Sequence, residues 1–290
     1  MIREITAKSI LQDVKQPDPW FGLRYNMNLY RGCQHGCIYC DSRSQCYKID
    51  NFDSEIVIKE NAIPLLKKEI AKKKIKGPIG LGSMNDPYMP VEMEFELTRQ
   101  ALEVIAAHRF PVHVLTKSDL IVRDLELYKK INFVYAAVSF TITTADDNLA
   151  KKIEPAAPLP SARFQAMQKF ASNGVMTGIT LMPLLPYIQD NVDNIVDIIK
   201  AAKDNGATYI IPAFGVTLRD RQRDYFYQKL DKEFPGLKER YIKKFKNNYF
   251  CLPEKSRMLD MIFREQCYKY GIETKIKQFT PGEPEQLALF

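Results

Sequence analysis

The sequence lacks the features that place a protein in or across a membrane. No apolar run approaches the roughly 18 to 20 residues needed to cross a bilayer. The first sixteen residues, MIREITAKSILQDVKQ, contain no continuous hydrophobic segment of the secretory type. Internal repeats and low-complexity tracts are also missing from the chain. We therefore expect a cytoplasmic protein that has no membrane partner.

The composition excludes several further classes of protein. The chain has 290 residues, of which 46% are hydrophobic and 27% are charged, as in ordinary globular proteins. Intrinsic disorder, collagen-like structure and a miniprotein held together by disulfides are excluded. At this length, one large α/β domain with an appendage and two separate domains are both compatible with the chain.

Basic residues exceed acidic ones, and the excess is concentrated in one stretch. The chain has 42 Lys and Arg against 35 Asp and Glu, a formal net charge of +7, which favours polyanionic partners. The segment Arg219–Lys246 holds ten basic and five acidic residues. Its interleaved aromatic residues are Tyr225, Phe226, Tyr227, Tyr241 and Phe245. This pattern is typical of a nucleic-acid surface, and equally of the solvated face of amphipathic helices.

Short apolar runs alternate with segments of helical period, which predicts repeated βα units. The predicted strands lie near Asn28–Arg31, Ile79–Gly82, Val112–Thr116, Phe133–Phe140, Met176–Met182 and Tyr209–Ala213. The predicted helices are Ala62–Lys74, Glu94–His108, Ile121–Ile131, Ser161–Asn173 and Val192–Asn205. Gly174 and Gly206 follow two of the helices, as expected for C-terminal caps. Six strands and their helices fit a partial (β/α)6 barrel of TIM type.

The chain divides into four parts on this interpretation. Residues 1–24 form an N-terminal extension, and residues 25–215 form the partial barrel. Residues 216–278 form a mainly helical, basic C-terminal region, in which Pro253 opens the last helix. Residues 279–290 contain two prolines and a glycine, which predicts a flexible tail.

Three cysteines directly follow the first predicted strand, in the segment NLYRGCQHGCIYCDSRS. Cys33, Cys37 and Cys40 have the spacing C-x3-C-x2-C, so one loop can wrap them around a single centre. Thiolates suit zinc or an iron-sulfur cluster. A cluster held by only three cysteines leaves one iron open to bind a small molecule. His35 or Cys46 could supply a fourth ligand, which keeps a zinc site as an alternative.

This cysteine spacing after the first strand of a βα barrel resembles the radical S-adenosylmethionine (SAM) superfamily. Within it, the segments RGCQHGCIYCDSR, GSMNDPYMPVE, LTKSDLIVRD, VSFTITT and IEPAAPLPSAR resemble the spore photoproduct lyase-like branch, also described as DNA repair photolyase-like proteins. The chain is most similar to the uncharacterised members of that branch. The resemblance implies an enzyme that reductively cleaves SAM to a 5'-deoxyadenosyl radical.

The resemblance also implies roles for individual residues. The three cysteines would hold a 4Fe-4S cluster, whose open iron would bind SAM. The residues that would contact SAM are Tyr39, Ser83, Asp86, Lys117 and Thr141. Most of these follow or end predicted strands, where barrel folds build their active sites. Glu154 and Arg163, in the segment IEPAAPLPSAR, are interpreted as a helix-capping pair or a structural salt bridge.

One departure from the lyase concerns the hydrogen donor. The lyase carries its donor cysteine in the loop after the second strand, whereas here that loop reads GSMNDPYMP and contains no cysteine. Cys46, Cys251 and Cys267 remain as candidate donors because an S–H bond is weak. Each of them could equally be an ordinary packed cysteine.

The last five residues, QLALF, resemble the short peptide by which bacterial repair factors bind the DNA sliding clamp. Gln286 could hydrogen-bond at the edge of a groove, while Leu287, Leu289 and Phe290 fill an apolar pocket. The alternative is a chain end that packs on its own barrel. A low-potential electron donor, such as flavodoxin or ferredoxin, and a second radical SAM protein are further expected partners.

The sequence therefore favours a radical SAM enzyme that acts on DNA or another nucleic acid, in lesion repair or base modification. A radical SAM enzyme acting on a protein or a small molecule is the first alternative. A zinc-stabilised nucleic-acid-binding protein is the second.

Overall fold

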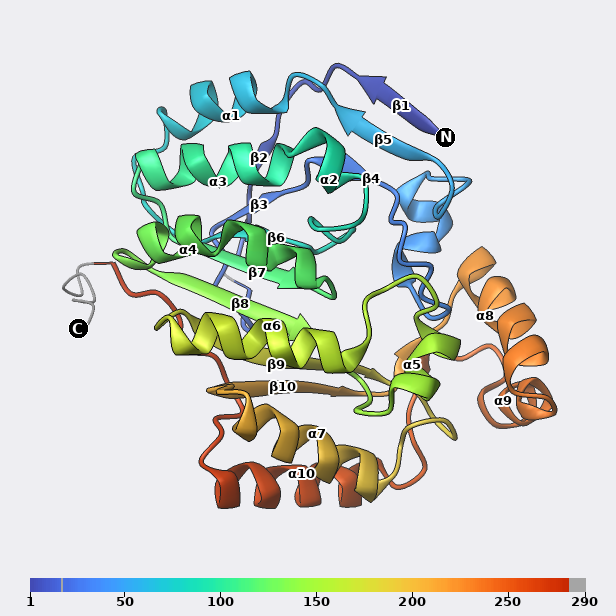
Figure 1. Ribbon diagram of the computed structural model, residues 1–290. Coiled ribbons are helices and arrows are strands. Elements are labelled where there is room, and N and C mark those ends of the chain that lie inside the picture. The colour runs from blue at the N-terminus through green and yellow to red at the C-terminus, as the bar shows by residue number, and fades with distance from the viewer. Residues whose placement is uncertain (17, 282–290) are drawn as a thin grey trace.

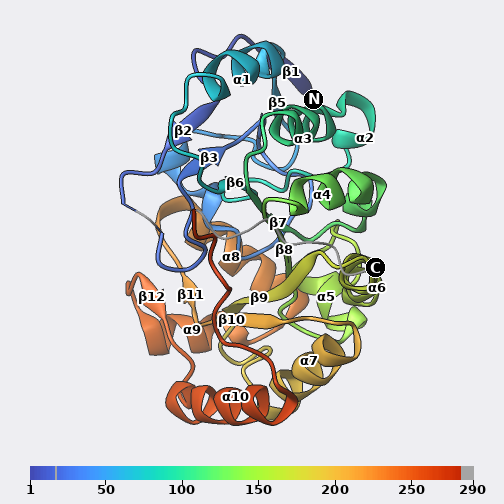
Figure 2. The same ribbon diagram turned by 90° about the vertical axis from the view of Figure 1, so that its left-hand side faces the viewer.

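A partial barrel forms the centre of the computed structural model, which describes residues 1–16 and 18–281. Within these residues, a seven-stranded sheet has the order β10-β9-β8-β7-β6-β3-β2. Its strands are β2 (Leu11–Asp13), β3 (Tyr25–Met27), β6 (Ile79–Leu81), β7 (Val112–Thr116), β8 (Ala136–Thr141), β9 (Met176–Leu184) and β10 (Tyr209–Phe214). Strands β3, β6, β7, β8, β9 and β10 run parallel, and β2 is antiparallel to β3. In the described chain β10 and β2 do not pair, so the curved sheet stays open on one side (Figure 2).

Helices cover the outer, convex side of this sheet (Figures 1 and 2). They are α1 (Ala62–Ile70), α2 (Glu92–Phe95), α3 (Leu97–Ala107), α4 (Leu125–Asn132), α6 (Pro160–Ser172), α7 (Val192–Asp204) and α10 (Ser256–Tyr270). Their apolar residues repeat at helical spacing, as Leu97, Ala101 and Ile105 do along α3, and these residues are buried. The apolar faces of the helices and the sheet together form the main core.

The elements beyond the carboxyl edge of the sheet are smaller. In Figure 1 they lie to the right, where the arrowheads of the parallel strands point. The helices there are α5 (Asp147–Ile153), α8 (Asp220–Glu233) and α9 (Leu237–Phe245), and short 3-10 turns cover Asp41–Arg43, Gln45–Tyr47 and Asp119–Asp124. A three-stranded sheet combines β1 (Ile2–Ile5), β5 (Ile56–Lys59) and β4 (Tyr30–Arg31), while β11 (Val216–Thr217) pairs with β12 (Phe250–Cys251).

The predicted βα alternation is confirmed, with corrections to its boundaries. The strand placed near Asn28–Arg31 is wrong, because the barrel strand is β3 at Tyr25–Met27 and Tyr30–Arg31 belongs to the smaller sheet. The helix predicted over Glu94–His108 is divided at Glu96, whose φ is 47°. Gly174 and Gly206 have φ angles of 73° and 79°, as a C-terminal cap requires.

Segments from both ends of the chain cross the open, concave side (Figure 2). The ring of Phe21 stacks on the ring of His113 in β7, with 4.5 Å between their centroids. The hydroxyl of Tyr135 donates to the backbone oxygen of Lys277 at 2.9 Å. These contacts close the barrel at the amino ends of its strands, so the interior is accessible from the opposite edge.

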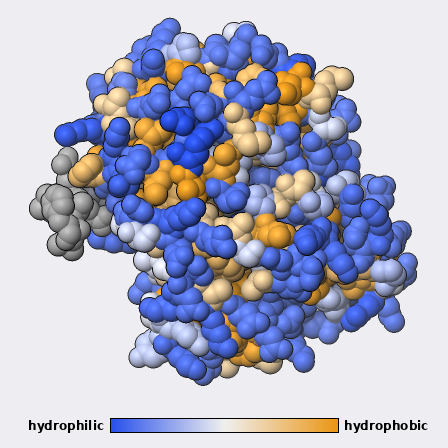
Figure 3. All heavy atoms as spheres, in the orientation of Figure 1, coloured by the Kyte–Doolittle hydropathy of each residue, from blue (hydrophilic) through white to orange (hydrophobic). Residues whose placement is uncertain are grey.

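The surface over the outer helices is mostly hydrophilic, and apolar residues interrupt it in small groups (Figure 3). Across the described residues, every helix falls short of the length and apolar character that crossing a membrane requires.

Candidate active site

A cavity of about 630 Å³ opens at the carboxyl ends of the parallel strands. The parallel register brings these ends to one edge of the sheet; for example, Thr141 lies beside Thr180. The cavity lining includes all eight residues assigned from the sequence to the metal centre or to SAM: Cys33, Cys37, Tyr39, Cys40, Ser83, Asp86, Lys117 and Thr141. The fold therefore brings together side chains from three loops and from the end of strand β8, as expected for an active site on a βα barrel.

The cysteine loop is fixed by backbone hydrogen bonds on both sides. The amide of Cys33 donates to the oxygen of Phe52, and the amide of Ile38 donates to that of Ile153, each at 2.9 Å. All three cysteines carry free thiols. Burial and the nearby Asp86 raise the pKa of the Cys33 thiol to about 12, and burial also raises the pKa of the Cys40 thiol. Binding of a metal centre must therefore displace protons from buried thiols.

His35, in the middle of the cysteine loop, is paired with a carboxylate from the loop after β6. Its Nε2 lies 3.1 Å from Oδ2 of Asp86, and both side chains are almost fully buried. Asp86 also accepts hydrogen bonds from Thr116 Oγ1 at 2.7 Å and from the amide of Lys117 at 2.6 Å. Burial disfavours the Asp86 carboxylate, but His35 and these donors hold its pKa at about 2. Asp86 thus joins the cysteine loop to the end of β7.

A second buried ion pair joins the cysteine loop to the end of β8. Arg163 Nη2 lies 2.5 Å from Glu154 Oε2, and each side chain is only 1% exposed. Glu154 accepts a hydrogen bond from the Tyr39 hydroxyl, while Arg163 Nη1 donates to the Thr141 oxygen at 2.8 Å. Burial disfavours both charges, yet the pairing lowers the pKa of Glu154 and raises that of Arg163. The pair therefore fixes Tyr39 relative to Thr141, in agreement with the salt-bridge interpretation.

Lys117 lies between these two pairs. Its Nζ is 5.7 Å from the centroid of the Tyr39 ring. Burial disfavours its ammonium group, but the neighbouring Cys37 and Glu154 hold its pKa above the usual value. A permanent positive charge therefore lines the cavity beside the cysteines, where it suits an anionic group of a ligand.

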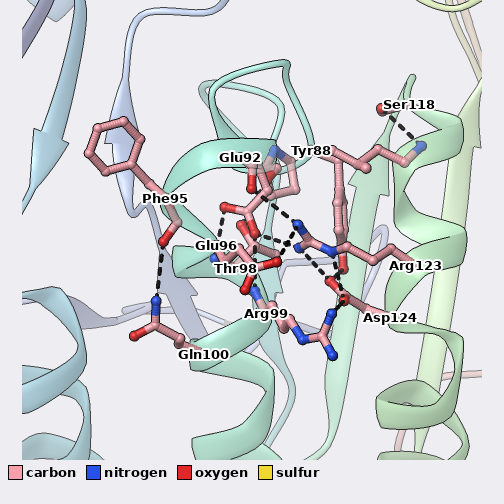
Figure 4. Close-up of polar contacts among 12 residues, drawn as sticks. Tyr88, Glu92, Phe95, Glu96, Thr98, Arg99, Gln100, Ser118, Arg123 and Asp124 are labelled. Atoms are coloured by element: carbon pink, nitrogen blue, oxygen red, sulfur yellow. Dashed lines mark hydrogen bonds and ion pairs between the residues drawn. The ribbon is translucent and has the colours of Figure 1, made fainter.

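A third polar network holds the loop after β6 against the loop after β7 (Figure 4). Arg123 Nη2 lies 2.8 Å from Glu92 Oε1 and 2.8 Å from Asp124 Oδ2. The Tyr88 hydroxyl donates to Asp124 at 3.1 Å, and the Thr98 amide donates to Glu92 at 3.0 Å. Both carboxylates are buried, so each needs these donors. The network determines how the two loops approach each other, and with them Asp86 and Lys117.

Sequence reasoning missed several polar residues of the cavity, among them Asn26 and Thr180. Asn26 Oδ1 accepts a hydrogen bond from the Ser83 hydroxyl at 3.1 Å, and the hydroxyls of Thr141 and Thr180 are 2.8 Å apart. Asn26 was missed because the first strand was predicted too late in the chain. Thr180 lies on a predicted strand, where the alternation of polar and apolar residues could have identified it.

The donor set fits an iron-sulfur cluster better than a zinc ion. Across the described residues, no three His, Cys, Asp or Glu side chains converge closely enough to hold a single metal ion. His35 faces Asp86, and Cys46 is exposed, with its Sγ 3.4 Å from the Ser44 hydroxyl. Three free thiols on one wall of a cavity suit a cluster that keeps one iron open for a ligand.

The candidate hydrogen donors lie elsewhere. Among the described residues that line the cavity, the thiols are Cys33, Cys37 and Cys40 alone. Cys251 is fully buried in β12, and Cys267 is fully buried on α10, a helix that packs against α7. Cys46, Cys251 and Cys267 are therefore not among the residues that line the cavity, and their role as hydrogen donors stays a prediction.

The basic C-terminal stretch forms the helices α8 and α9, which fits the alternative of amphipathic helices. Phe226, Tyr241 and Phe245 are buried and pack together with Ile38 of the cysteine loop. These rings are therefore not available to stack on bases. The proposed clamp-binding residues Gln286, Leu287, Leu289 and Phe290 lie outside the described residues.

Comparison with known proteins identifies the family. The sequence model of the Radical SAM superfamily matches residues 27–199. An uncharacterized protein of Methanocaldococcus jannaschii is 37% identical over 191 residues, 65% of this chain and 70% of the relative. An uncharacterized protein of Mycobacterium tuberculosis is 28% identical over 263 residues, 88% of this chain and 77% of the relative.

Among solved structures, the fold is similar to that of a mutant spore photoproduct lyase with bound AdoMet and dinucleoside spore photoproduct. The TM-score is 0.69 at 15% identity, over 94% of this chain and 80% of the lyase. The family match covers the cysteine loop together with Ser83, Asp86, Lys117 and Thr141. The chain is an enzyme that belongs to the radical SAM superfamily.

Proposed function

We propose that this enzyme directs radical SAM chemistry at a base of a nucleic acid, in lesion repair or base modification. A 4Fe-4S cluster would supply the electron that cleaves SAM, and Cys33, Cys37 and Cys40 would hold it. Tyr39, Ser83, Asp86, Lys117 and Thr141 would bind and orient SAM around it. The protein's remaining task is to hold the substrate at the cavity mouth and to exclude water.

The observation that carries this proposal is an exposed aromatic side chain in the cavity wall. Phe250 lines the cavity and is nevertheless 44% exposed. The neighbouring Tyr249 is 52% exposed, and its ring lies 5.7 Å from the guanidinium carbon of Arg219. Exposed rings beside a cation favour a ligand that has a planar base and a phosphate.

Two further observations support a nucleic acid. The net charge of +7 favours a polyanion. The lyase structure with a similar fold has a bound dinucleoside spore photoproduct. Because the cavity is open at its mouth, an extrahelical or single-stranded base could enter it.

The test is anaerobic incubation of the iron-loaded protein with SAM, a reductant, and ultraviolet-damaged or undamaged oligonucleotides. Mass spectrometry would follow 5'-deoxyadenosine and the nucleosides in parallel. We expect an altered nucleoside in one of the two substrates. In the variant Phe250→Ala, we expect its yield to fall about tenfold, equivalent to about 1.4 kcal/mol of lost stacking.

The matched control is Tyr268→Ala, because Tyr268 is an aromatic residue that is 91% exposed on α10 and does not line the cavity. This variant should behave as the parent protein does. Cleavage of SAM with no change in either oligonucleotide would contradict the proposal and favour a protein or small-molecule substrate.

A further inference from the structure

The first residues of α8 bind the segment that follows the cysteine loop. Asp220 accepts hydrogen bonds from the Ser44 hydroxyl at 2.7 Å and from the Gln45 amide at 3.2 Å. Arg221 Nε donates to the backbone oxygen of Arg43 at 2.7 Å, and its Nη1 lies 2.7 Å from Oδ1 of Asp50. Further along the helix, the Gln222 side chain donates to the Tyr39 oxygen at 3.1 Å. The C-terminal region thus positions the metal-binding loop.

The side chain at the centre of this contact is Arg43. It is only 7% exposed, and its guanidinium carbon lies 3.7 Å from the centroid of the Tyr225 ring on α8 and 5.3 Å from that of Phe52. Its Nε is 3.4 Å from the backbone oxygen of Cys37, and its Nη2 forms an ion pair with Asp53. A cation is therefore held between two rings, against the backbone of a cluster ligand.

The other charges near the cysteines largely offset one another. Glu154 is paired with Arg163, and the carboxylate of Asp86 lies near the ammonium group of Lys117. The partner of Arg43 differs from these because the Asp53 side chain is 33% exposed, whereas that of Arg43 is 8% exposed. Water screens the exposed carboxylate more strongly than the buried cation. The field at the cysteines should therefore retain a net positive contribution from Arg43.

We propose that Arg43, which α8 holds in place through Tyr225, is a positioning residue that raises the reduction potential of the cluster. Reduction moves one electron from a low-potential donor, such as dithionite, onto the cluster, whose net charge becomes one unit more negative while the thiolates stay bound. A nearby positive charge stabilises that reduced form. The proposal rests on the iron-sulfur cofactor implied by the family and is independent of the nucleic-acid substrate.

The test measures the midpoint potential of the iron-loaded protein in a dithionite titration followed by electron paramagnetic resonance. Arg43→Met keeps a long apolar side chain between the two rings but removes the charge. We expect the midpoint potential of this variant to fall by about 59 mV. For one electron, this shift corresponds to about a tenfold change in the ratio of reduced to oxidised protein at a fixed solution potential. Asp53→Asn removes the opposing charge, so we expect its potential to rise.

Lys232→Gln is the matched control, because it removes one positive charge from the exposed outer part of α8. Its potential should equal that of the parent protein. Iron and sulfide content, measured for every variant, shows whether the cluster is fully assembled. If Arg43→Met binds iron poorly, the sign of the shift in Asp53→Asn still decides the question, because Asp53 is partly exposed.

An unchanged potential in Asp53→Asn, or shifts of the same sign in Asp53→Asn and Arg43→Met, would overturn the proposal. The measurement needs no nucleic acid and no SAM. Failure of the proposed function and failure of this inference are therefore distinguishable.

Discussion

His113 shows how one buried side chain makes this fold sensitive to acid. The residue is fully buried in β7, where its Nε2 lies 2.8 Å from the Ser139 hydroxyl and Phe21 stacks on its ring. Burial lowers its pKa to about 3, against an ordinary value of 6.5. Below pH 6.5 the unfolded chain takes up a proton that the folded chain refuses, so the free energy of unfolding falls as the pH falls.

Because of His113, we therefore expect the free energy of unfolding to fall by about 2 kcal/mol between pH 8 and pH 5. The decrease is about 1.36 kcal/mol for each pH unit below pH 6.5. Urea denaturation of the protein and of His113→Gln at both pH values measures this. The glutamine amide can still donate to Ser139 but does not titrate. Over the same pH interval, the free energy of unfolding of this variant should therefore fall by about 2 kcal/mol less than that of the parent protein. Equal losses in the two proteins would show that His113 is protonated in the folded state.

Some residues of the site could be predicted from the sequence, and others could not. Cys33, Cys37 and Cys40 were predicted because their spacing is local and their chemistry is specific. Lys117 and Thr141 were predicted from the resemblance to the family, and their place at the ends of predicted strands agreed with it. The role of Arg43 was not predicted, since it depends on Tyr225, which is far away in sequence and reaches it only through the packing of α8.

At the scale of elements, the turn after β6 determines where the loop of Ser83 and Asp86 lies. Gly82 has a φ of 96°, and a Cβ atom there would meet the backbone oxygen of Leu115 at 2.1 Å. Gly174 also has a positive φ, of 73°, but a Cβ atom there would meet nothing within 4 Å. An alanine at position 174 would therefore adopt only an unfavourable backbone conformation, whereas an alanine at position 82 would also collide with β7.

Gly174→Ala should lower the free energy of unfolding by about 1–2 kcal/mol, the usual cost of the left-handed conformation. Gly82→Ala should cost about 1–3 kcal/mol more, because the turn must move away from β7. It should also weaken SAM binding in equilibrium dialysis, since Ser83 and Asp86 move with the turn. Equal stability and equal SAM affinity in the two variants would contradict this account.

The βα pattern of the barrel followed from the sequence because each element buries its own apolar residues at a regular period. The smaller sheet of β1, β5 and β4 was not predicted, because its strands are short and β1 pairs with β5 across more than fifty residues, as Ile2 does with Ile56. The helix α5 was also missed: it is short and ends where Glu154 turns toward the cysteine loop. Such elements depend on tertiary contacts more than on local pattern.

At the scale of the whole molecule, two of the three hydrophobic cores of the described chain have different tasks. The main core lies between the sheet and its outer helices and contains Phe170. A second core joins α8 and α9 to the cysteine loop and contains Phe226 together with Cys37 and Ile38. The C-terminal region therefore supports the cysteine loop, because its apolar residues complete the core that contains Cys37 and Ile38.

Phe170 and Phe226 offer a matched pair, because both are phenylalanines that are fully buried. Replacement of either by alanine should lower the free energy of unfolding by about 3–5 kcal/mol. Only Phe226→Ala should accelerate the loss of iron to a chelator under native conditions, since its cavity loosens the packing around Cys37 and Ile38. Iron release, followed by the absorbance of the chelate in anaerobic buffer, measures this difference. Equal rates in the two variants would mean that the second core contributes only general stability, whereas a selective effect of Phe226→Ala would make α8 and α9 a structural part of the iron site.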